Sequence, residues 1–437
     1  MGTSERGAAR RTPRRSGQTR FEGRVDFWVF SVHNRHMLEY EDALERILAA
    51  VGPATAERTP LAQAHRRILA ERILSPMDLP PFDNSAMDGY AVRARDVQGA
   101  TANAPKQLRL RGKVAAGGNF QGAVEPGDCV RVFTGSLLPP GADAVVMQED
   151  TRTEPGEPEV VWFLDGAKPW ENVRFRGEDV KRGMVAGEAG EEVSAGRVSL
   201  FAALGLGEVS VGKRPVAGLL ASGSELAEPG QPLPPGGIYE SNRAGLAALL
   251  AQAGATSKSF PLVKDSAALT REALTAAFAE CDVVITTGGV SVGELDFIKS
   301  AFVELGGEQE FWRVAIRPGR PFVFGRWQGK FLFGLPGNPV SAFVTFLLLV
   351  RPALRRWQGA TEAGLARQMG TLAEALSNPG ERRHFMRVRI DGNGEIRPAG
   401  GQASHMLNSL AGANALVDVP PQTTLKAGSV VQALRWQ

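Results

Sequence analysis

The stretch between residues 215 and 360 constrains the fold most, because short apolar runs alternate there with helical patterns. Residues 216–220 and 282–286 are typical of buried strands, and Gly- and Ser-rich turns follow both of them. Strands that alternate with helices form a parallel sheet covered by helices on both faces. Ligands of such sheets bind at the carboxyl ends of the strands, so we expect a site where these turns meet.

Further elements of this region can be predicted from periodicity and from end signals. Ser241 is expected to cap a helix that Gly254 ends. The apolar run 340–350 stops at Arg351-Pro352 and is shorter than the roughly 20 residues that span a bilayer, so it predicts a buried helix and no membrane partner. The predicted helices are 242–253, 265–280, 294–305 and 338–357, with further strands at 259–263 and 331–335.

The regions on either side have a different character. Residues 38–74 have the spacing of two helices, the second over 62–73. Residues 75–168 hold short β-rich runs separated by turn-forming residues, and 370–437 alternate strands with turns. A chain of 437 residues exceeds one ordinary domain. The predicted fold class is therefore a multidomain chain, with an α/β/α domain, a β insert, an N-terminal mixed domain and a small C-terminal β domain.

Charge is distributed unevenly along the chain. Residues 1–36 hold eight arginines and three acids, a net charge of +5. The whole chain has a net charge of +3, so the remaining residues have a net charge of −2. The body of the chain is nearly neutral, which argues against a nucleic-acid partner. We expect the arginine-rich segment to be disordered. It fits a basic targeting or interaction arm, or a translated leader that precedes a true start at Met37.

Cysteine and histidine are too sparse for common metal sites or a disulfide framework. Cys129 and Cys281 lie far apart without a partner motif, which suits a reducing cytoplasm. The histidines lack the spacing of metal ligands. They are His33, His36, His65, His384 and His405.

Three turns predicted at the strand ends carry residues suited to an anion and to Mg²⁺. They are 221–225, 287–293 and 334–339. Small residues let backbone N–H groups face a phosphate, and carboxylates beside phosphate attract Mg²⁺. Glu225 and Asp296 are the candidate metal ligands, although an acid at a helix start also stabilises the helix dipole. The candidate cradle consists of Thr287, Gly288, Gly289 and Ser291.

Two more segments carry candidate binding residues. Arg313, Arg317 and Arg320 flank a Pro-Gly turn, and arginine forks bind oxyanions. The stretch LPPFDNSAMDGYAV, residues 79–92, is so rich in turn formers that it predicts a rigid loop able to close on a ligand. A purely structural corner would have the same composition.

Long motifs along the chain resemble one family. In order they are PPFDNSAMDGYAV, FTGSLLPPGADAVVMQED, NVRFRGED, SGSEL, IYESN, TTGGVSVGELDF, RPGRPFVFG and GLPGNPVSAFVTF. Together they are similar to the molybdopterin molybdenumtransferase family, also called MoeA and the E domain of gephyrin. The resemblance covers about residues 37–437.

The resemblance implies a dimer of four-domain chains. Its site lies between the α/β domain of one subunit and the insert domain of the other, so 79–92 acts across the dimer. The C-terminal domain is implied to be a small β-barrel. The expected boundaries are 1–36 for the tail, 37–74 with 170–211 for the mixed domain, 75–169 for the insert, 212–361 for the molybdopterin-binding α/β domain and 362–437 for the barrel.

The implied reaction is insertion of molybdate into adenylyl-molybdopterin with release of AMP, in the cytoplasm. Molybdopterin adenylyltransferase and molybdoenzyme apoproteins are the implied partners. Arg313 and Arg317 replace frequent lysines of the family, and Ser222-Gly-Ser-Glu225 replaces the usual T-G-D-E. The positions that carry over are Asp88, Thr134, Asp179, Glu225, Asp265, Asp296, Pro336 and Pro339.

Two other classes of function compete with this one. The α/β domain alone resembles the preceding adenylyltransferase, which lacks the insert and the barrel. The same fold also serves as a dimeric scaffold or as a molybdopterin-binding protein without catalysis. Retention of Asp88, Glu225 and Asp296 favours the enzyme.

Overall fold

The computed structural model describes residues 37–290 and 296–436. The predicted tail, residues 1–36, and the predicted cradle residue Ser291 lie outside the described residues. The chain divides into two units, 1–36 and 37–437. Within the described residues, no helix has both the length and the apolar character needed to cross a membrane.

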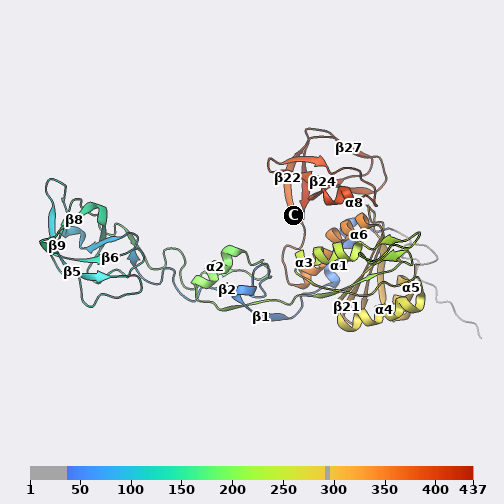
Figure 1. The fold of residues 1–437 in the computed structure, drawn as a ribbon, viewed down its shortest axis with the longest axis horizontal. Coiled ribbons are helices and arrows are strands. Elements are labelled where there is room, and N and C mark those ends of the chain that lie inside the picture. The colour runs from blue at the N-terminus through green and yellow to red at the C-terminus, as the bar shows by residue number, and fades with distance from the viewer. Residues whose placement is uncertain (1–36, 291–295, 437) are drawn as a thin grey trace, which may run out of the picture. The chain divides into compact units, whose positions relative to one another are not determined.

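A six-stranded sheet carries the predicted alternation of strands and helices (Figure 1). The first four strands of its order are parallel, and the last two add an antiparallel edge. The order is β16 (Thr256–Ser259), β13 (Val216–Ala221), β17 (Val283–Thr287), β21 (Lys330–Leu335), β20 (Pro321–Trp327) and β18 (Glu308–Arg313).

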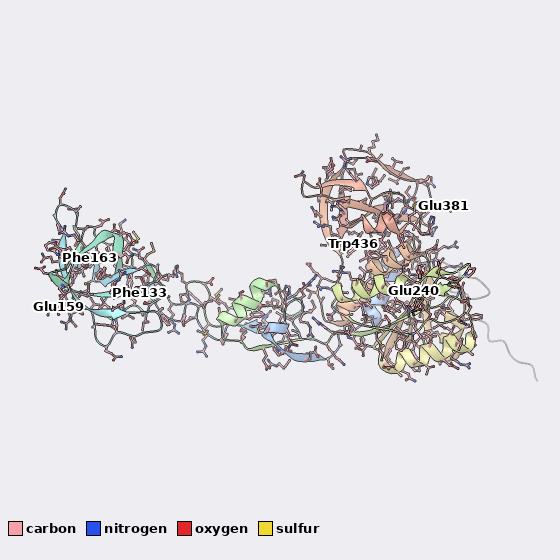
Figure 2. The ribbon with its side chains drawn as sticks, viewed as in Figure 1. Phe133, Glu159, Phe163, Glu240, Glu381 and Trp436 are labelled. Carbon is pink, nitrogen blue, oxygen red and sulfur yellow. The ribbon has the colours of Figure 1, made fainter. Side chains whose placement is uncertain are left out.

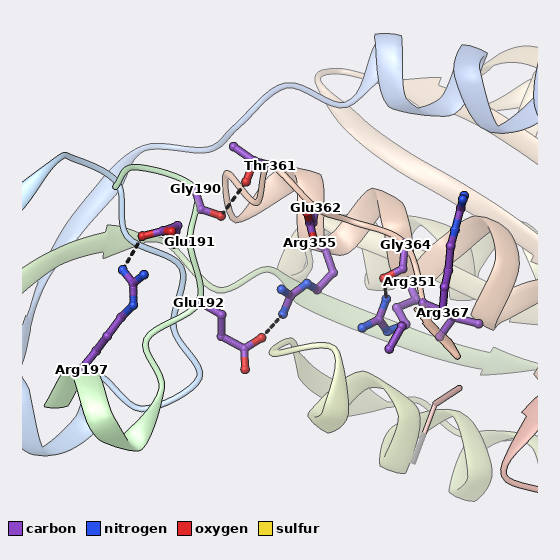
Figure 3. A pocket seen from close by; sticks show the side chains of 12 residues that line it. Gly190, Glu191, Glu192, Arg197, Arg351, Arg355, Thr361, Glu362, Gly364 and Arg367 are labelled. Atoms are coloured by element: carbon purple, nitrogen blue, oxygen red, sulfur yellow. Dashed lines mark hydrogen bonds and ion pairs between the residues drawn. The ribbon is translucent and has the colours of Figure 1, made fainter. Parts of the chain in front are cut away.

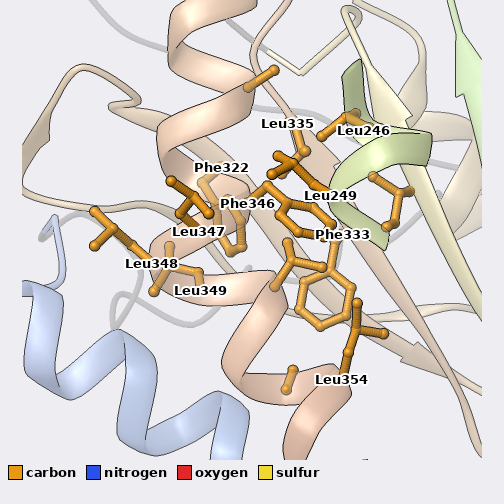
Figure 4. Close-up of a cluster of buried hydrophobic side chains, with 14 of the residues drawn as sticks. Leu246, Leu249, Phe322, Phe333, Leu335, Phe346, Leu347, Leu348, Leu349 and Leu354 are labelled. Atoms are coloured by element: carbon orange, nitrogen blue, oxygen red, sulfur yellow. The ribbon is translucent and has the colours of Figure 1, made fainter. Parts of the chain in front are cut away.

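Helices pack on both faces of this sheet. One buried cluster joins the sheet to α1 (Tyr40–Ala50), α3 (Asn242–Gln252) and the helical segment 339–357. Figure 4 shows leucines of α3 and of that segment around Phe322 and Phe333. A second cluster joins the sheet to α4 (Ala267–Glu280) and α5 (Ile298–Glu304). Each fully buried Leu or Phe stabilises such a core by about 1.5–3 kcal/mol relative to an exposed one.

The predicted long helix over 338–357 is present but contains one wider turn. It consists of α6 (Pro339–Thr345), the π-helical turn η5 (Phe346–Val350) and α7 (Arg351–Trp357). Pro352 has no backbone N–H to donate to the preceding turn, which accounts for a change of hydrogen-bond pattern at this point.

The predicted helix over 62–73 is wrong. Only a 3-10 turn, η2 (Leu61–Gln63), forms there, and β2 (Ile73–Leu74) pairs with β11 (Val185–Gly187). The backbone N–H groups of Arg66 and Leu69 donate to the carbonyls of Val193 and Glu191. Non-local backbone pairing has therefore replaced the helix that periodicity predicted.

The rest of the mixed region packs around this segment. Its core includes Leu69, Phe201 and Val211, whereas Ala43 and Ile47 of α1 belong to the core of the α/β sheet. The predicted domain boundaries themselves stay a prediction. The remaining elements here are β1 (Ala56–Pro60), β12 (Glu208–Gly212) and α2 (Ala195–Ala203). In the α/β region, β14 (Leu226–Ala227) pairs in parallel with β15 (Ile238–Tyr239).

The β-rich region forms its own six-stranded sheet. Its core includes Tyr90 and Phe163, whose rings meet edge to face at 5.9 Å (Figure 2 labels Phe163). Two short strands, β3 (Asn84–Ser85) and β10 (Val173–Arg174), pair beside it. The order of the sheet is β7 (Ala144–Met147), β4 (Gly89–Val92), β6 (Asp128–Val132), β5 (Lys106–Val114), β9 (Glu157–Phe163) and β8 (Thr151–Glu154).

The C-terminal region is a closed five-stranded barrel, as expected. Pairing between β24 and β26 closes the ring, and β19 (Ile316–Arg317) adds to β24 in parallel. The short α8 (Leu407–Ala411) follows a loop of the barrel, and β23 (Leu376–Asn378) pairs with β27 (Thr423–Leu425). The ring strands are β24 (Arg383–Ile390), β25 (Glu395–Pro398), β22 (Ala366–Leu372), β28 (Val430–Arg435) and β26 (Ala415–Val419).

Candidate active site

The three predicted turns begin at the same level of the sheet. The last residues of β13, β17 and β21 are in register, because Ala221 pairs with Thr287 and Thr287 pairs with Leu335. The N–H of Ser222 then donates to Thr287 O at 3.1 Å, and the N–H of Gly288 donates to Leu335 O at 3.2 Å. Parallel register therefore brings the three loops together, as the sequence predicted.

Gly288 allows these loops to pack closely. Its φ is +81°, and a Cβ at this position would lie 2.5 Å from Ser222 O. Its amide is also bonded to Leu335 O. Gly288 thus differs from the predicted role of an amide donor to an anion, since what it provides is close backbone approach and a surface free of a side chain.

Two cavities open at this edge of the sheet. The larger, of about 660 Å³, is lined by the predicted residues Glu225, Asp265, Thr287, Gly288, Gly289, Asp296 and Pro339. The smaller, of about 270 Å³, shares Gly288, Gly289 and Asp296 and adds Pro336. The structure therefore gathers most of the predicted site residues of the α/β region around one hollow.

Other residues of the larger cavity were not predicted to line it. Tyr239 and Asn242 come from the IYESN motif, and Asn338 comes from the GLPGNP turn, so the quoted motifs already contained them. His405 and Leu407 come from the barrel region. No local pattern signals that a loop so distant in sequence lies beside the strand ends.

The three carboxylates of the cavity have different surroundings. Asp265 Oδ2 accepts a hydrogen bond from the N–H of Ser224 at 2.9 Å, and Ser224 Oγ accepts one from the N–H of Asp265 at 3.1 Å. This reciprocal pair fixes the loop that carries Glu225. Asp296 lies close enough to Lys299 to interact with its charge: burial lowers the pKa of Lys299, and the carboxylate of Asp296 partly opposes that shift. Asp265 thus acts on the shape of the loop, whereas Glu225 and Asp296 present carboxylates to the cavity.

These carboxylates fit a magnesium site in which the protein supplies only some of the metal ligands. Across residues 37–290 and 296–436, no group of three or more His, Cys, Asp or Glu could hold a metal ion by itself. Mg²⁺ commonly takes one or two carboxylates and completes its shell with water and substrate phosphate oxygens. Glu225 and Asp296 meet that requirement, so the donor set is compatible with Mg²⁺ brought together with a phosphorylated substrate.

The helix that begins beside the cavity is capped differently from the prediction. Ser241 occupies the cap position but makes no capping hydrogen bond with its side chain. Instead Glu240 Oε1 accepts from the N–H groups of Asn242 and Arg243, at 2.6 and 3.0 Å. Arg243 also pairs with Glu228, so a buried ion-pair network fixes the start of α3. A glutamate reaching two residues forward satisfied the amides that the serine was expected to bind.

The three predicted arginines lie outside both cavities. The Arg313 guanidinium stacks on Trp312 at 3.7 Å, with Lys299 on the same ring at 4.1 Å. Burial, followed by Arg320 and Arg317, lowers the pKa of Arg382. The strand pairing of β19 with β24 thus places Arg317 and Arg320 beside barrel residues that the sequence did not single out.

His384 belongs to the same positively charged region. Burial, followed by the charges of Arg317, Arg387 and Arg382, lowers the pKa of His384 to about 4. The imidazole is therefore neutral at pH 7. A neutral ring beside three arginines limits the charge repulsion of the cluster.

In the insert sheet, the structure brings together the predicted residues Asp88 and Thr134. The N–H and the Oγ of Thr134 both donate to Asp88 Oδ1 at 2.8 Å. These two hydrogen bonds, together with the nearby charge of Arg131, lower the pKa of Asp88. Arg131 also stacks over Tyr90 at 4.9 Å and over Phe133 at 5.2 Å. The result is an exposed carboxylate that is held in place and kept ionised.

The loop that presents Asp88 is held by hydrogen bonds to its own backbone. Asn84 and Ser85 are buried, and their side chains donate to the carbonyls of Phe82 and Met87. The N–H of Leu138 donates to Asp83 O. The buried polar side chains of this loop therefore form hydrogen bonds to the loop's own backbone.

Large apolar side chains surround this loop. Phe82 and Met87 of the loop are exposed. Trp170 and Phe175, which flank β10, the partner strand of β3, are exposed as well. Asp83 Oδ1 accepts a hydrogen bond from the N–H of Arg176, which ties that segment to the loop. Exposed apolar groups gathered in one place are typical of a surface that contacts another molecule.

Asp88, Thr134 and Asp179 do not line the two cavities of this chain. Asp179 is exposed in a turn, where its N–H donates to Leu79 O. The predicted site residues therefore form two separate groups, one at the strand ends and one in the insert region. Their predicted chemical roles stay predictions.

Comparison with known sequences covers almost all of the described chain. Residues 38–205 match the MoeA N-terminal region (domain I and II), and residues 218–356 match a probable molybdopterin-binding domain. Residues 369–436 match the MoeA C-terminal region (domain IV).

Individual proteins are similar over nearly their full length. The chain is 38% identical to a molybdopterin molybdenumtransferase of Haemophilus influenzae, over 87% of this chain and 94% of that one. It is 38% identical to molybdopterin molybdenumtransferase 2 of Mycobacterium tuberculosis, over 91% and 98%. A crystal structure of the molybdopterin biosynthesis MoeA protein from Pyrococcus horikoshii OT3 is similar with a TM-score of 0.79 and 31% identity, covering 92% of this chain and all of that one.

Proposed function

Because this chain belongs to the MoeA family of molybdopterin molybdenumtransferases, we propose that it performs the transferase reaction of molybdenum cofactor biosynthesis. The substrates are molybdate and adenylyl-molybdopterin, and the products are the molybdenum cofactor and AMP. The observation that carries this proposal is the cavity at the strand ends, where Glu225 and Asp296 meet loops of close backbone approach.

In this proposal the strand-end loops bind the phosphate-bearing part of the substrate. Gly288 and Gly289 leave a surface without side chains, so a bulky ligand can approach the backbone between two of the loops. Asn242 and Asn338 add amide groups on the same cavity. A site of about 660 Å³ is within the ordinary size range for small-molecule ligands.

Glu225 and Asp296 are the residues that would hold Mg²⁺, which would neutralise phosphate charge when bound. Asp265 keeps Glu225 in place by fixing Ser224. The region around Arg317 and Arg320 supplies positive charge near the smaller cavity, since Pro321 lines that cavity. This charge suits the entry of molybdate, an oxyanion.

We further propose that the enzyme is a homodimer in which Asp88 and Thr134 complete the site of the partner subunit. Two observations support this. The pair does not line the strand-end cavities of its own chain. Exposed Phe82, Met87 and Trp170 beside the pair supply an apolar surface for such a contact.

The test is molybdate-dependent release of AMP. Purified protein is mixed with adenylyl-molybdopterin and Mg²⁺, with and without molybdate, and free AMP is followed in time. The proposal predicts release only with molybdate and a loss of release when Mg²⁺ is chelated. Tight binding of the substrate without any release would instead support a binding protein or a scaffold.

A further inference from the structure

One further cavity of the described chain lies away from the proposed active site. It has a volume of about 880 Å³ and shares no lining residue with the strand-end cavities. Its walls come from the segment 190–197, from α7 and from the segment 361–367, which leads into the barrel (Figure 3). Neither the proposed reaction nor the motifs quoted above use these residues.

The walls of this cavity are firmly joined. The N–H of Thr361 donates to Gly190 O at 3.1 Å. Gly190 has a φ of +85°, and a Cβ there would lie 2.4 Å from Thr361 Cγ2. Arg355 of α7 pairs with Glu192 at 2.6 Å across the same junction. These contacts join the segment 190–197 to Thr361 and to α7.

Four arginines line the cavity, and their carboxylate partners do not balance them. Arg197 pairs with Glu191, and Arg355 shares Glu192 with Arg66. In the described part of the chain, neither Arg351 nor Arg367 has an ion pair. Glu362 is the remaining acid of the lining.

Arg351 and Arg355 make this imbalance local. They are four residues apart on α7, so they share one face of the helix, where like charges repel. Arg351 Nη1 donates to the carbonyls of Ala363 and Gly364 at 2.9 and 2.7 Å, which satisfies hydrogen bonding but not charge. Burial, followed by the charge of Arg355, lowers the pKa of Arg351 to about 10.

A second observation points to a missing acceptor. Arg355 Nε is buried and has no hydrogen-bond partner among residues 37–290 and 296–436. The side chain of Arg355 is only 12% exposed. A buried guanidinium N–H without an acceptor is costly. The positive charge of Arg355 is therefore only partly compensated within the described chain, and an oxyanion in the cavity would offset it.

We propose that this cavity is a binding site for a small dianionic ligand, a phosphate monoester or a dicarboxylate, held chiefly by Arg351 and Arg355 with Arg367 at the rim. Both ligand types present paired oxygens at a spacing that guanidinium groups recognise. The bound anion would bridge α7 to the segment 361–367. Occupancy would then stiffen the connection between the sheet and the barrel, so the site is suited to regulation by a metabolite.

The test is hydrogen–deuterium exchange on the full chain with millimolar inorganic phosphate or succinate. Exchange reports where a ligand binds, so binding at the strand ends is not mistaken for binding here. We expect slower exchange in 188–197 and 359–367 with at least one of the two anions. Protection by phosphate alone assigns a phosphate monoester, and protection by succinate alone assigns a dicarboxylate. No protection of these segments with either anion overturns the proposal.

Three variants sharpen this test. Arg351→Gln should raise the anion concentration for half-maximal protection at least about tenfold, because a charged hydrogen-bond donor is lost. Glu362→Gln should lower that concentration a few fold, because it removes a repelling carboxylate. Arg58→Gln is the control: Arg58 forms an exposed ion pair with Glu208, and neither residue lines the cavity. This variant should leave the anion concentration for half-maximal protection unchanged. If Arg351→Gln fails to fold, Arg367→Gln replaces it, and protection that is equal in all variants overturns the proposal.

Discussion

The strand-end cavity and the Asp88–Thr134 pair are formed by different kinds of interaction. The cavity is built from backbone: three parallel strands end in register, and Gly288 lets their loops meet. The pair is built from side-chain hydrogen bonds on a loop and is open to solvent. The cavity encloses carboxylates in a hollow, whereas the pair holds one carboxylate at an exposed surface. This difference is what the proposal of a site completed between two subunits expects.

The largest expected effect comes from removing one carboxylate from each group. Asp296→Asn and Asp88→Asn should each lower the rate of molybdate-dependent AMP release by about 100-fold or more, the range seen when a preorganised charged group is lost. The measurement is the initial rate of AMP release at saturating substrate.

Thermal unfolding provides the control for these two variants. Both should unfold within about 2 °C of the parent chain, since surface substitutions change stability little. Glu157→Gln, an exposed acid on β9, should keep full activity. An Asp88→Asn variant with normal activity would show that only the strand-end cavity matters.

A glycine substitution tests the claim that the cavity depends on backbone approach. Gly288→Ala places a Cβ 2.5 Å from Ser222 O at a φ of +81°. We expect a loss of about 2–4 kcal/mol in the free energy of unfolding, measured with urea, from strain and steric overlap together.

Gly99→Ala is the matched control for Gly288→Ala. Gly99 has a similar φ of +73° in the insert region, but a Cβ there meets nothing within 4 Å. It should cost only about 1 kcal/mol, from φ alone. Equal losses in the two variants would contradict the packing role of Gly288.

The smallest expected effect concerns the pH dependence of the pair. Hydrogen bonds from Thr134 hold the pKa of Asp88 below its ordinary value. If the reaction needs the ionised carboxylate, activity persists above that pKa and is lost as the pH falls through it. Thr134→Val removes one donor, so the pKa of Asp88 rises and the acid limb of the rate profile moves to higher pH. Thr134→Ser, which keeps the hydroxyl, should leave the limb in place.

The sequence was most informative where structure follows from local rules. Apolar strands followed by small-residue turns predicted the convergence of Glu225, Thr287 and Pro339, because parallel strands must end on the same edge of the sheet. The turn-forming residues of 79–92 likewise predicted an irregular loop, and the side chains of Asn84 and Ser85 form hydrogen bonds to its backbone.

The sequence was least informative where partners are distant. The segment 62–73 has a helical period, yet its backbone bonds to residues 191–193 instead. His405 reaches the cavity from the barrel, and Arg382 approaches Arg317 only because β24 pairs with β19. Such long-range pairings have no local signature. The sequence also did not show that Glu240, and not its neighbour Ser241, accepts hydrogen bonds from the amides at the start of α3.

The most direct test of the shared site is a mixture of two inactive variants. Asp88→Ala and Asp296→Ala chains are denatured together, refolded and assayed for AMP release against each variant refolded alone. If the site is shared, each mixed dimer has one intact site, and random pairing restores about a quarter of the parent activity. Activity that stays at the level of the separate variants, while an affinity tag on one variant co-purifies the untagged other variant, would contradict the account.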